Sequence, residues 1–91
     1  MKILLSRRAE KVLRKLHPKI YRQVQEKIVR LAHEGLKSAD IKPLKGFHGL
    51  WRADSGEYRI IFRIDGDALM ISLIGKRNDD EIYRELERML F

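Results

Sequence analysis

Apolar residues in the first third of the chain recur with the period of an α-helix in two consecutive segments. Polar and basic residues fill the other positions, as is typical of helices that cover a core with one face. Pro18 separates the segments and suits the first turn of the second helix, and Gly35 suits its end. Because the connection is short, we expect an antiparallel helical hairpin. The apolar positions are Ala9, Val12, Leu13 and Leu16 in the first segment and Ile20, Val24, Ile28, Leu31 and Ala32 in the second.

From residue 50 onward the apolar period changes to two, which is typical of β-strands. Residues 50–54, 58–64 and 68–74 are therefore predicted to be strands, with turns at residues 55–56 and 65–67. Strands that follow one another so closely pair with their neighbours as an antiparallel meander.

Each end of the chain adds one further element. The apolar run Met1–Leu5 predicts a short buried strand, and Ser6 is expected to be the N-cap of the first helix. Near the other end, Asn78 and Glu81 have the spacing of a capping box, and the acidic residues between them suit the positive end of a helix. The packing face of this last helix is predicted to be Ile82, Leu86, Met89 and Leu90.

The remaining segment, Leu36–Gly46, has no apolar period and is predicted to be a connector. The expected order over residues 1–91 is therefore β-α-α-β-β-β-α. This order predicts an α+β fold with a mainly antiparallel sheet and the helical hairpin on one face. With 91 residues, the chain has room for a single domain with one modest core.

The composition excludes several classes of protein. The absence of cysteine rules out a disulfide framework, a thiolate metal site and a cysteine nucleophile. No apolar run approaches the roughly 20 residues that a membrane span needs. The first eight residues are too quickly charged for a signal peptide. We therefore expect a cytoplasmic protein with no membrane partner.

The charge of the chain is high and unevenly distributed. The net charge is +7, and residues 1–45 carry 13 Lys and Arg against 4 Asp and Glu, a net of +9. Residues 46–91 carry 7 against 9, a net of −2. Charged residues that are scattered over a protein can simply keep its surface soluble. An excess of this size on a short segment also suits docking on phosphates, whose contacts give affinity without sequence specificity.

The usual catalytic sets are missing from the sequence. His17, His33 and His48 are dispersed, without the i, i+4 pairing of a helical metal site, so each is interpreted as a surface or capping residue. The adjacent Asp79 and Asp80 are explained by helix capping. We therefore predict no metal site and no cofactor.

The face of the meander opposite the core carries the more informative residues. If Trp51 and Tyr58 face the core, Arg52 and Arg59 share the opposite face. Arg77 ends the last strand, and Tyr83 follows on the helix, so the three arginines and one aromatic residue should gather on the side away from the helical hairpin. By residue type alone, such arginines are explained most simply by the solubility of an exposed strand.

Four sequence pieces in order favour a functional interpretation. They resemble the RelE branch of the RelE/ParE toxins, whose pattern is a Leu-x-Gly connector, a Tyr-Arg strand, and a strand ending in Gly-Lys/His-Arg before a tyrosine. The element order covers the whole chain, and the motifs cover residues 44–83. The pieces are Leu44-Lys45-Gly46, Leu50-Trp51-Arg52, Gly56-Glu57-Tyr58-Arg59-Ile60-Ile61-Phe62 and Ile74-Gly75-Lys76-Arg77 through Tyr83.

The resemblance implies an mRNA interferase that acts in the ribosomal A site and is kept silent by a cognate antitoxin. Its catalytic residues would be Arg59 in the strand, Arg77 at the end of the last strand, and Tyr83, with Arg52 where the family often has a lysine or arginine. Asp54 departs from the pattern, because RelE carries a second lysine near that position. An anion beside the scissile phosphate would weaken transition-state stabilisation.

The implied reaction uses the 2′-OH of the substrate against the neighbouring phosphate, so it needs no covalent nucleophile. The protein must align the attack, remove a proton and neutralise the developing charge, and arginine suits the last task. Other cations are expected to bind mRNA or the ribosome, and Lys45 or Arg63 could compensate for Asp54. These cations are Lys45, Arg63, Lys76, Arg7, Arg8, Lys11, Arg14 and Lys15.

Two alternatives remain open at the level of the sequence. On the same fold, a ParE-type toxin would inhibit DNA gyrase without catalysis, and it would not require Arg59, Arg77 and Tyr83 to converge. A plain basic RNA-binding domain would explain the charge but not the order of the motifs. The joint presence of the three residues favours the nuclease.

Overall fold

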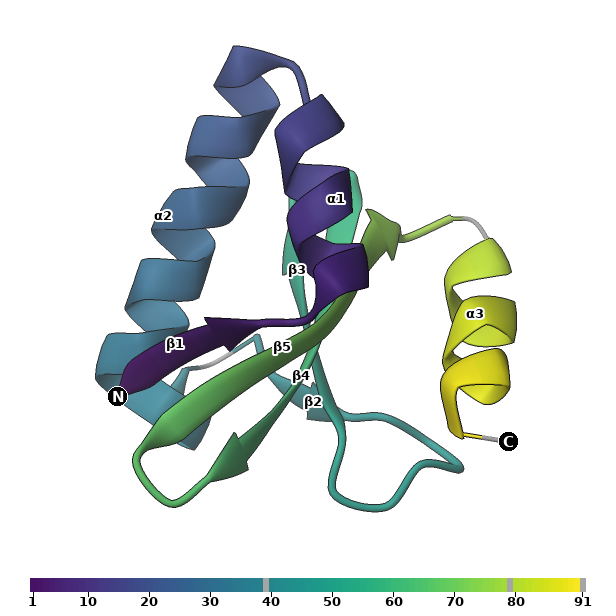
Figure 1. Cartoon of the computed structure of the whole chain (residues 1–91). Helices are drawn as coiled ribbons and strands as arrows, with labels where there is room; N and C mark the ends of the chain where they lie inside the picture. Colours follow the sequence, from purple (N-terminus) through teal and green to yellow (C-terminus); the bar gives the residue numbers. More distant parts are fainter. Residues whose placement is uncertain (39, 79, 91) are drawn as a thin grey trace.

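The computed structural model describes residues 1–38, 40–78 and 80–90. Its five strands form one sheet in the order β1-β5-β4-β3-β2, in which β1 and β5 are parallel and the other pairs antiparallel. Helices α1 and α2 lie on one side of the sheet and α3 on the other (Figure 1). The predicted α+β fold with a mainly antiparallel sheet is confirmed. The elements are β1 (Lys2–Leu5), α1 (Arg7–Lys15), α2 (Pro18–Glu34), the 3-10 turn η1 (Gly35–Lys37), β2 (Lys42–Pro43), β3 (Trp51–Ser55), β4 (Tyr58–Asp65), β5 (Ala68–Lys76) and α3 (Glu81–Leu90).

The helical hairpin begins and ends at the residues that the sequence predicts. Ser6 Oγ accepts a hydrogen bond from the backbone N–H of Ala9 at 3.0 Å, which satisfies a free donor of the first turn of α1. The same hydroxyl donates to the carbonyl of Ser72 at 2.6 Å and so ties α1 to the sheet. Pro18 opens α2, and Gly35 ends it with a φ of 60°, a value that glycine adopts without strain.

The larger hydrophobic core lies between this hairpin and the sheet. The predicted apolar stripes of both helices point into it, and Ile60 and Phe62 of β4 are fully buried at its centre. Trp51 and Tyr58 pack at its margin, as predicted. The buried members are Ala9, Leu13, Val24, Ile28, Leu31, Ala32, Ala53, Ile60, Phe62, Leu69, Ile71 and Ile74.

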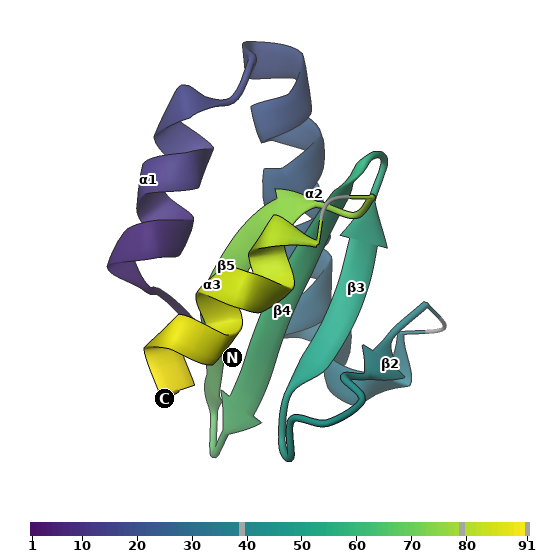
Figure 2. The same cartoon turned by 90° about the vertical axis from the view of Figure 1, so that its right-hand side faces the viewer.

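A smaller core lies on the other face, beneath α3, which crosses in front of β4 and β5 (Figure 2). Ile82 and Leu86 of α3 pack there with Ile61 of β4, so β4 contributes alternately to both cores. The helix comes very close to the sheet at Gly75, where a Cβ atom would lie 3.0 Å from a methyl carbon of Ile82. Glycine at this position therefore lets α3 dock.

Two predictions for the N-terminal half are wrong. The strand at Met1–Leu5 forms, but the side chains of β1 are exposed, because it lies at the edge of the sheet and has a neighbouring strand on one side alone. The connector Leu36–Gly46 contains the last two residues of η1 and the short strand β2, which pairs with β3. A two-residue strand is too short to give an apolar period.

The predicted cap and packing face of α3 also need correction. The helix begins at Glu81, and the carbonyl of Asp80 accepts the N–H of Arg84 at 3.2 Å, so the helix starts two residues later than a cap at Asn78 requires. Met89 is 40% exposed, because the helix extends past the edge of the smaller core. Asp79 and the side chain of Leu90 lie outside the described residues. None of the described helices is long and apolar enough to cross a membrane.

Candidate anion-binding site on the sheet

Three of the four predicted catalytic residues, Arg59, Arg77 and Tyr83, meet where β3, β4 and the end of β5 approach the first turn of α3. Asp54 lies directly opposite Arg59 in the pairing of β3 with β4. Arg77 follows β5, and its backbone N–H donates to the carbonyl of Glu57 at 2.9 Å, which fixes the chain beside the turn between β3 and β4. Tyr83 lies in the first turn of α3. The long-range pairing of the strands thus brings together residues that are far apart in sequence.

Arg59 is the most constrained of these residues. Its Nε donates to Asp54 Oδ1 at 3.0 Å, its Nη1 donates to the hydroxyl of Tyr83, and its side chain is only 13% exposed. Burial disfavours the charged guanidinium, but the hydrogen bonds to Asp54 and Tyr83 outweigh it, so the pKa of Arg59 lies above its ordinary value. Arg59 therefore stays charged and is held in place from both sides.

Asp54 joins the two predicted catalytic arginines. Its Oδ2 lies 3.8 Å from Nη1 of Arg77, while Oδ1 accepts from Arg59. The sequence identified Asp54 as a departure from the family pattern, but not as a common partner of Arg59 and Arg77. Side chains alternate between the two faces of a strand, and this alternation along β3 places Asp54 on the same face of the sheet as Arg59. The sequence alone could therefore have indicated that the two side chains lie close together.

In the described part of the chain, three other predicted cations form no hydrogen bond with this group: Arg52, which is predicted to be catalytic, and Lys45 and Lys76, which are predicted to bind RNA. Arg52 lies on β3 opposite Ile61 and is half-buried, with no ion pair among the residues that the structure describes. Lys45 and Lys76 are exposed, as a contact with a large partner would require.

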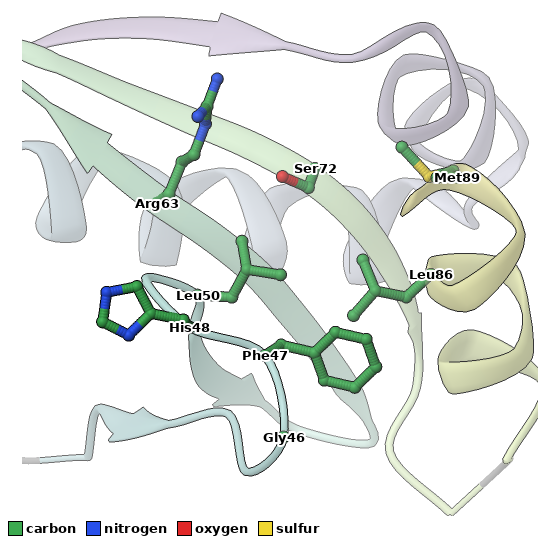
Figure 3. A pocket seen from close by; sticks show the side chains of 8 residues that line it. All are labelled: Gly46, Phe47, His48, Leu50, Arg63, Ser72, Leu86 and Met89. Atoms are coloured by element: carbon green, nitrogen blue, oxygen red, sulfur yellow. The ribbon is translucent and has the colours of Figure 1, made fainter. Parts of the chain in front are cut away.

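Arg63 lies at the other end of the same face, away from Arg59. It lines a separate groove of about 440 Å³ between the loop at residues 46–49, β4, β5 and the end of α3 (Figure 3). Ser72 also lines this groove, and it is the extra residue of β5 at a β-bulge between Ile61 and Phe62 of β4. The suggestion that Arg63 compensates for Asp54 is not supported by this placement. The groove is lined by Gly46, Phe47, His48, Leu50, Arg63, Ser72, Leu86 and Met89.

The basic residues predicted on the first helix form its outer surface. Arg8 forms an ion pair of 3.4 Å with Glu85 of α3, and Arg14 pairs with Glu10 one turn away. Arg7, Lys11 and Lys15 are exposed and have no ion pair among the described residues. This helix therefore presents unpaired positive charge.

The geometry of the site suits a phosphate group. Arg59 has five N–H donors, and its hydrogen bonds to Asp54 and Tyr83 leave donors of the guanidinium for a ligand. Arg77 is 47% exposed and can reach an incoming anion. The hydroxyl of Tyr83 accepts from Arg59 and keeps its own proton as a donor. Among the described residues, no group of three or more His, Asp or Glu side chains could hold a metal ion.

Comparisons with known proteins agree with this fold and these motifs. The family described as the ParE toxin of the type II toxin–antitoxin system, parDE, matches residues 3–81. The toxin–antitoxin complex RelBE2 from Mycobacterium tuberculosis contains a chain with 30% identity and a TM-score of 0.72, covering 84% of this chain and 96% of that one.

Two further solved structures share the fold. The isolated RelE toxin of E. coli has 21% identity and a TM-score of 0.72, covering 99% of this chain and 98% of that one. The YoeB dimer of Staphylococcus aureus has 16% identity and a TM-score of 0.69, covering 80% and 92%. The comparison with curated proteins gave no match.

Proposed function

This chain belongs to the ParE toxin family of type II toxin–antitoxin systems, within the RelE/ParE superfamily, and we propose that it is a ribosome-dependent mRNA endonuclease. The observation that carries the proposal is the convergence of Arg59, Arg77 and Tyr83 around Asp54: hydrogen bonds join Arg59 to Asp54 and Tyr83, and an ion pair of 3.8 Å joins Arg77 to Asp54. A protein that only binds a partner does not need a largely desolvated arginine held by two side chains.

In the proposed reaction, the 2′-hydroxyl of the RNA loses its proton to solvent water and its oxygen attacks the adjacent phosphorus. The bond to the 5′-oxygen breaks, this oxygen takes up a proton, and a 2′,3′-cyclic phosphate and a 5′-hydroxyl result. Arg59 and Arg77 bind the phosphate and stabilise the charge that develops on it. Arginine suits this role, because its planar fork bonds phosphate through two donors. The hydroxyl of Tyr83 accepts from Arg59 and would donate its own proton to the leaving oxygen or support the bound nucleotide. Arg52 contributes positive charge from the next strand.

The proposed reaction depends on the ribosome, because the site contains few groups suited to proton removal. In the described part of the chain, none of the three histidines forms a hydrogen bond with Arg59 or Arg77, and His17 accepts the N–H of Lys19 at the start of α2. These histidines are His17, His33 and His48. The ribosome would compensate for these few groups by holding the codon in a conformation from which the 2′-oxygen attacks readily. The exposed cations of α1, together with Lys45 and Lys76, would bind ribosomal and messenger RNA phosphates.

The second candidate function is inhibition of DNA gyrase, and the match to the ParE family is the observation in its favour. It requires a protein-binding surface rather than a catalytic group. The arginine–tyrosine group favours the nuclease, and Asp54 favours the inhibitor, because it reduces the positive charge available to a phosphate.

The cellular target separates the two functions. Inducing the toxin should stop amino-acid incorporation within minutes while DNA supercoiling stays normal. Pulse labelling of protein synthesis and plasmid topology, measured in the same culture, test this. If DNA breaks and an SOS response come first, the chain is a gyrase inhibitor.

A further inference from the structure

We infer that Asp54 is a specificity-determining residue that keeps free RNA out of the site, so that only a phosphate delivered in a fixed position reaches Arg59 and Arg77. This inference rests on the proposed function, and it names the substrate state that the site accepts.

The first argument is that Asp54 already occupies the Nε donor of Arg59 and lies within ion-pair distance of Arg77, the two arginines that a phosphate would bind. One carboxylate oxygen accepts from Arg59 Nε at 3.0 Å, and the other lies 3.8 Å from Arg77 Nη1. A carboxylate presents two oxygens to arginine in much the same way as a phosphate does. Asp54 is fixed on β3 opposite Arg59, so it competes with every incoming anion from within the same molecule.

The second argument is that the carboxylate is not needed as a buried ion pair for folding. The Asp54 side chain is 36% exposed, and ion pairs with this degree of exposure to water contribute little to stability. Arg59 does require an acceptor for its Nε, because it is nearly buried. A neutral amide oxygen can also accept this hydrogen bond, and the negative charge adds an effect of its own.

That effect is repulsion of phosphate. A phosphate that approaches Arg59 and Arg77 must come near the carboxylate that joins them, and charges this close repel one another even in water. Flexible free RNA makes only one or two contacts with the site, and these are too weak to offset the repulsion. An mRNA held by the ribosome can bind despite the repulsion, because its phosphate is already in position and the toxin is bound through its basic surface.

Asp54→Asn tests the inference, because it removes the charge and keeps an oxygen that can accept from Arg59. Glu57→Gln is the matched control: it makes the same change in net charge at an exposed position in the adjacent turn. The measurement is the Kd for a short single-stranded RNA with 2′-O-methyl groups, which cannot be cleaved. We expect Asp54→Asn to bind it tighter by about tenfold, and Glu57→Gln to change the affinity much less.

Two additional measurements keep the test decisive. Thermal unfolding and the NMR signal of the Arg59 Nε–H report whether Asp54→Asn preserves the fold and the hydrogen bond. If it does not, Asp54→Ser supplies a smaller neutral acceptor. Equal affinity gains in Asp54→Asn and Glu57→Gln, or weaker binding in Asp54→Asn, would overturn the inference.

The binding assay involves no cleavage and no ribosome, so its result is independent of the experiment on translation and supercoiling. A toxin that arrests translation without the affinity gain in Asp54→Asn refutes the role of Asp54 alone. If Asp54→Asn gains affinity for RNA but the toxin does not arrest translation, the nuclease function is refuted, and Asp54 still acts as a barrier to phosphate.

Discussion

The two faces of the sheet differ in what they bury and in what they leave accessible. The hairpin face buries the larger core, and no charged side chain among the described residues is fully buried there. The α3 face buries a smaller core and carries Arg59, Asp54 and Tyr83 beside it. Most of the stability can therefore come from one face, while the other holds charged groups whose desolvation would cost free energy in a tightly packed core.

Strand β4 shows how one segment serves both faces. Ile60 and Phe62 point into the larger core, whereas Arg59 and Arg63 point to the other side. Because side chains alternate along a strand, a shift of one residue would exchange these two sets. The burial of Phe62 therefore also fixes the direction of Arg59.

The largest expected effect concerns stability. Phe62→Ala should lower the free energy of unfolding by about 3–5 kcal/mol, because it leaves a cavity at the centre of the larger core. Leu86→Ala, in the smaller core, should mainly release α3 and remove Tyr83 from Arg59. Denaturant titration, together with amide exchange in α3, distinguishes the two effects. If both variants lower global stability equally, the two faces do not differ as described.

A smaller effect in free energy, but a large one in rate, is expected from the charged groups. Arg77→Ala should lower single-turnover cleavage of ribosome-bound mRNA on the order of 100-fold or more, with fold and ribosome affinity nearly unchanged, because Arg77 acts on charge that develops in the transition state. Arg63→Ala, in the separate groove, should have a much smaller effect. Similar small losses in both variants would mean that this face is only a charged surface.

The smallest expected effect concerns the rate of antitoxin binding. We propose that an acidic or amphipathic segment of the cognate antitoxin covers the basic surface and the α3 face, because residues 1–45 carry a net charge of +9. Raising the salt concentration should slow association markedly, since it screens long-range attraction. Stopped-flow mixing at several ionic strengths measures this. A rate that does not depend on salt would contradict a charge-steered encounter.

The sequence by itself determined the helices, the three longer strands and the face to which most of their residues point. Apolar periods of 3.6 and 2 are local properties, and Ser6, Pro18 and Gly35 set boundaries through backbone geometry that is also local. The family motifs identified Arg59, Arg77 and Tyr83, and alternation on β3 and β4 placed Arg52 and Arg59 on one face.

Only the tertiary structure decided which of these residues bond to one another. The pairing of Asp54 with Arg59, and its contact with Arg77, depend on the register of β3 with β4 and on where the chain leaves β5. The exposure of β1, the pairing of β2 and the separate position of Arg63 likewise depend on which elements lie beside them. The reason is that contacts between distant segments follow from strand order, register and a β-bulge, and no local period in the sequence specifies these.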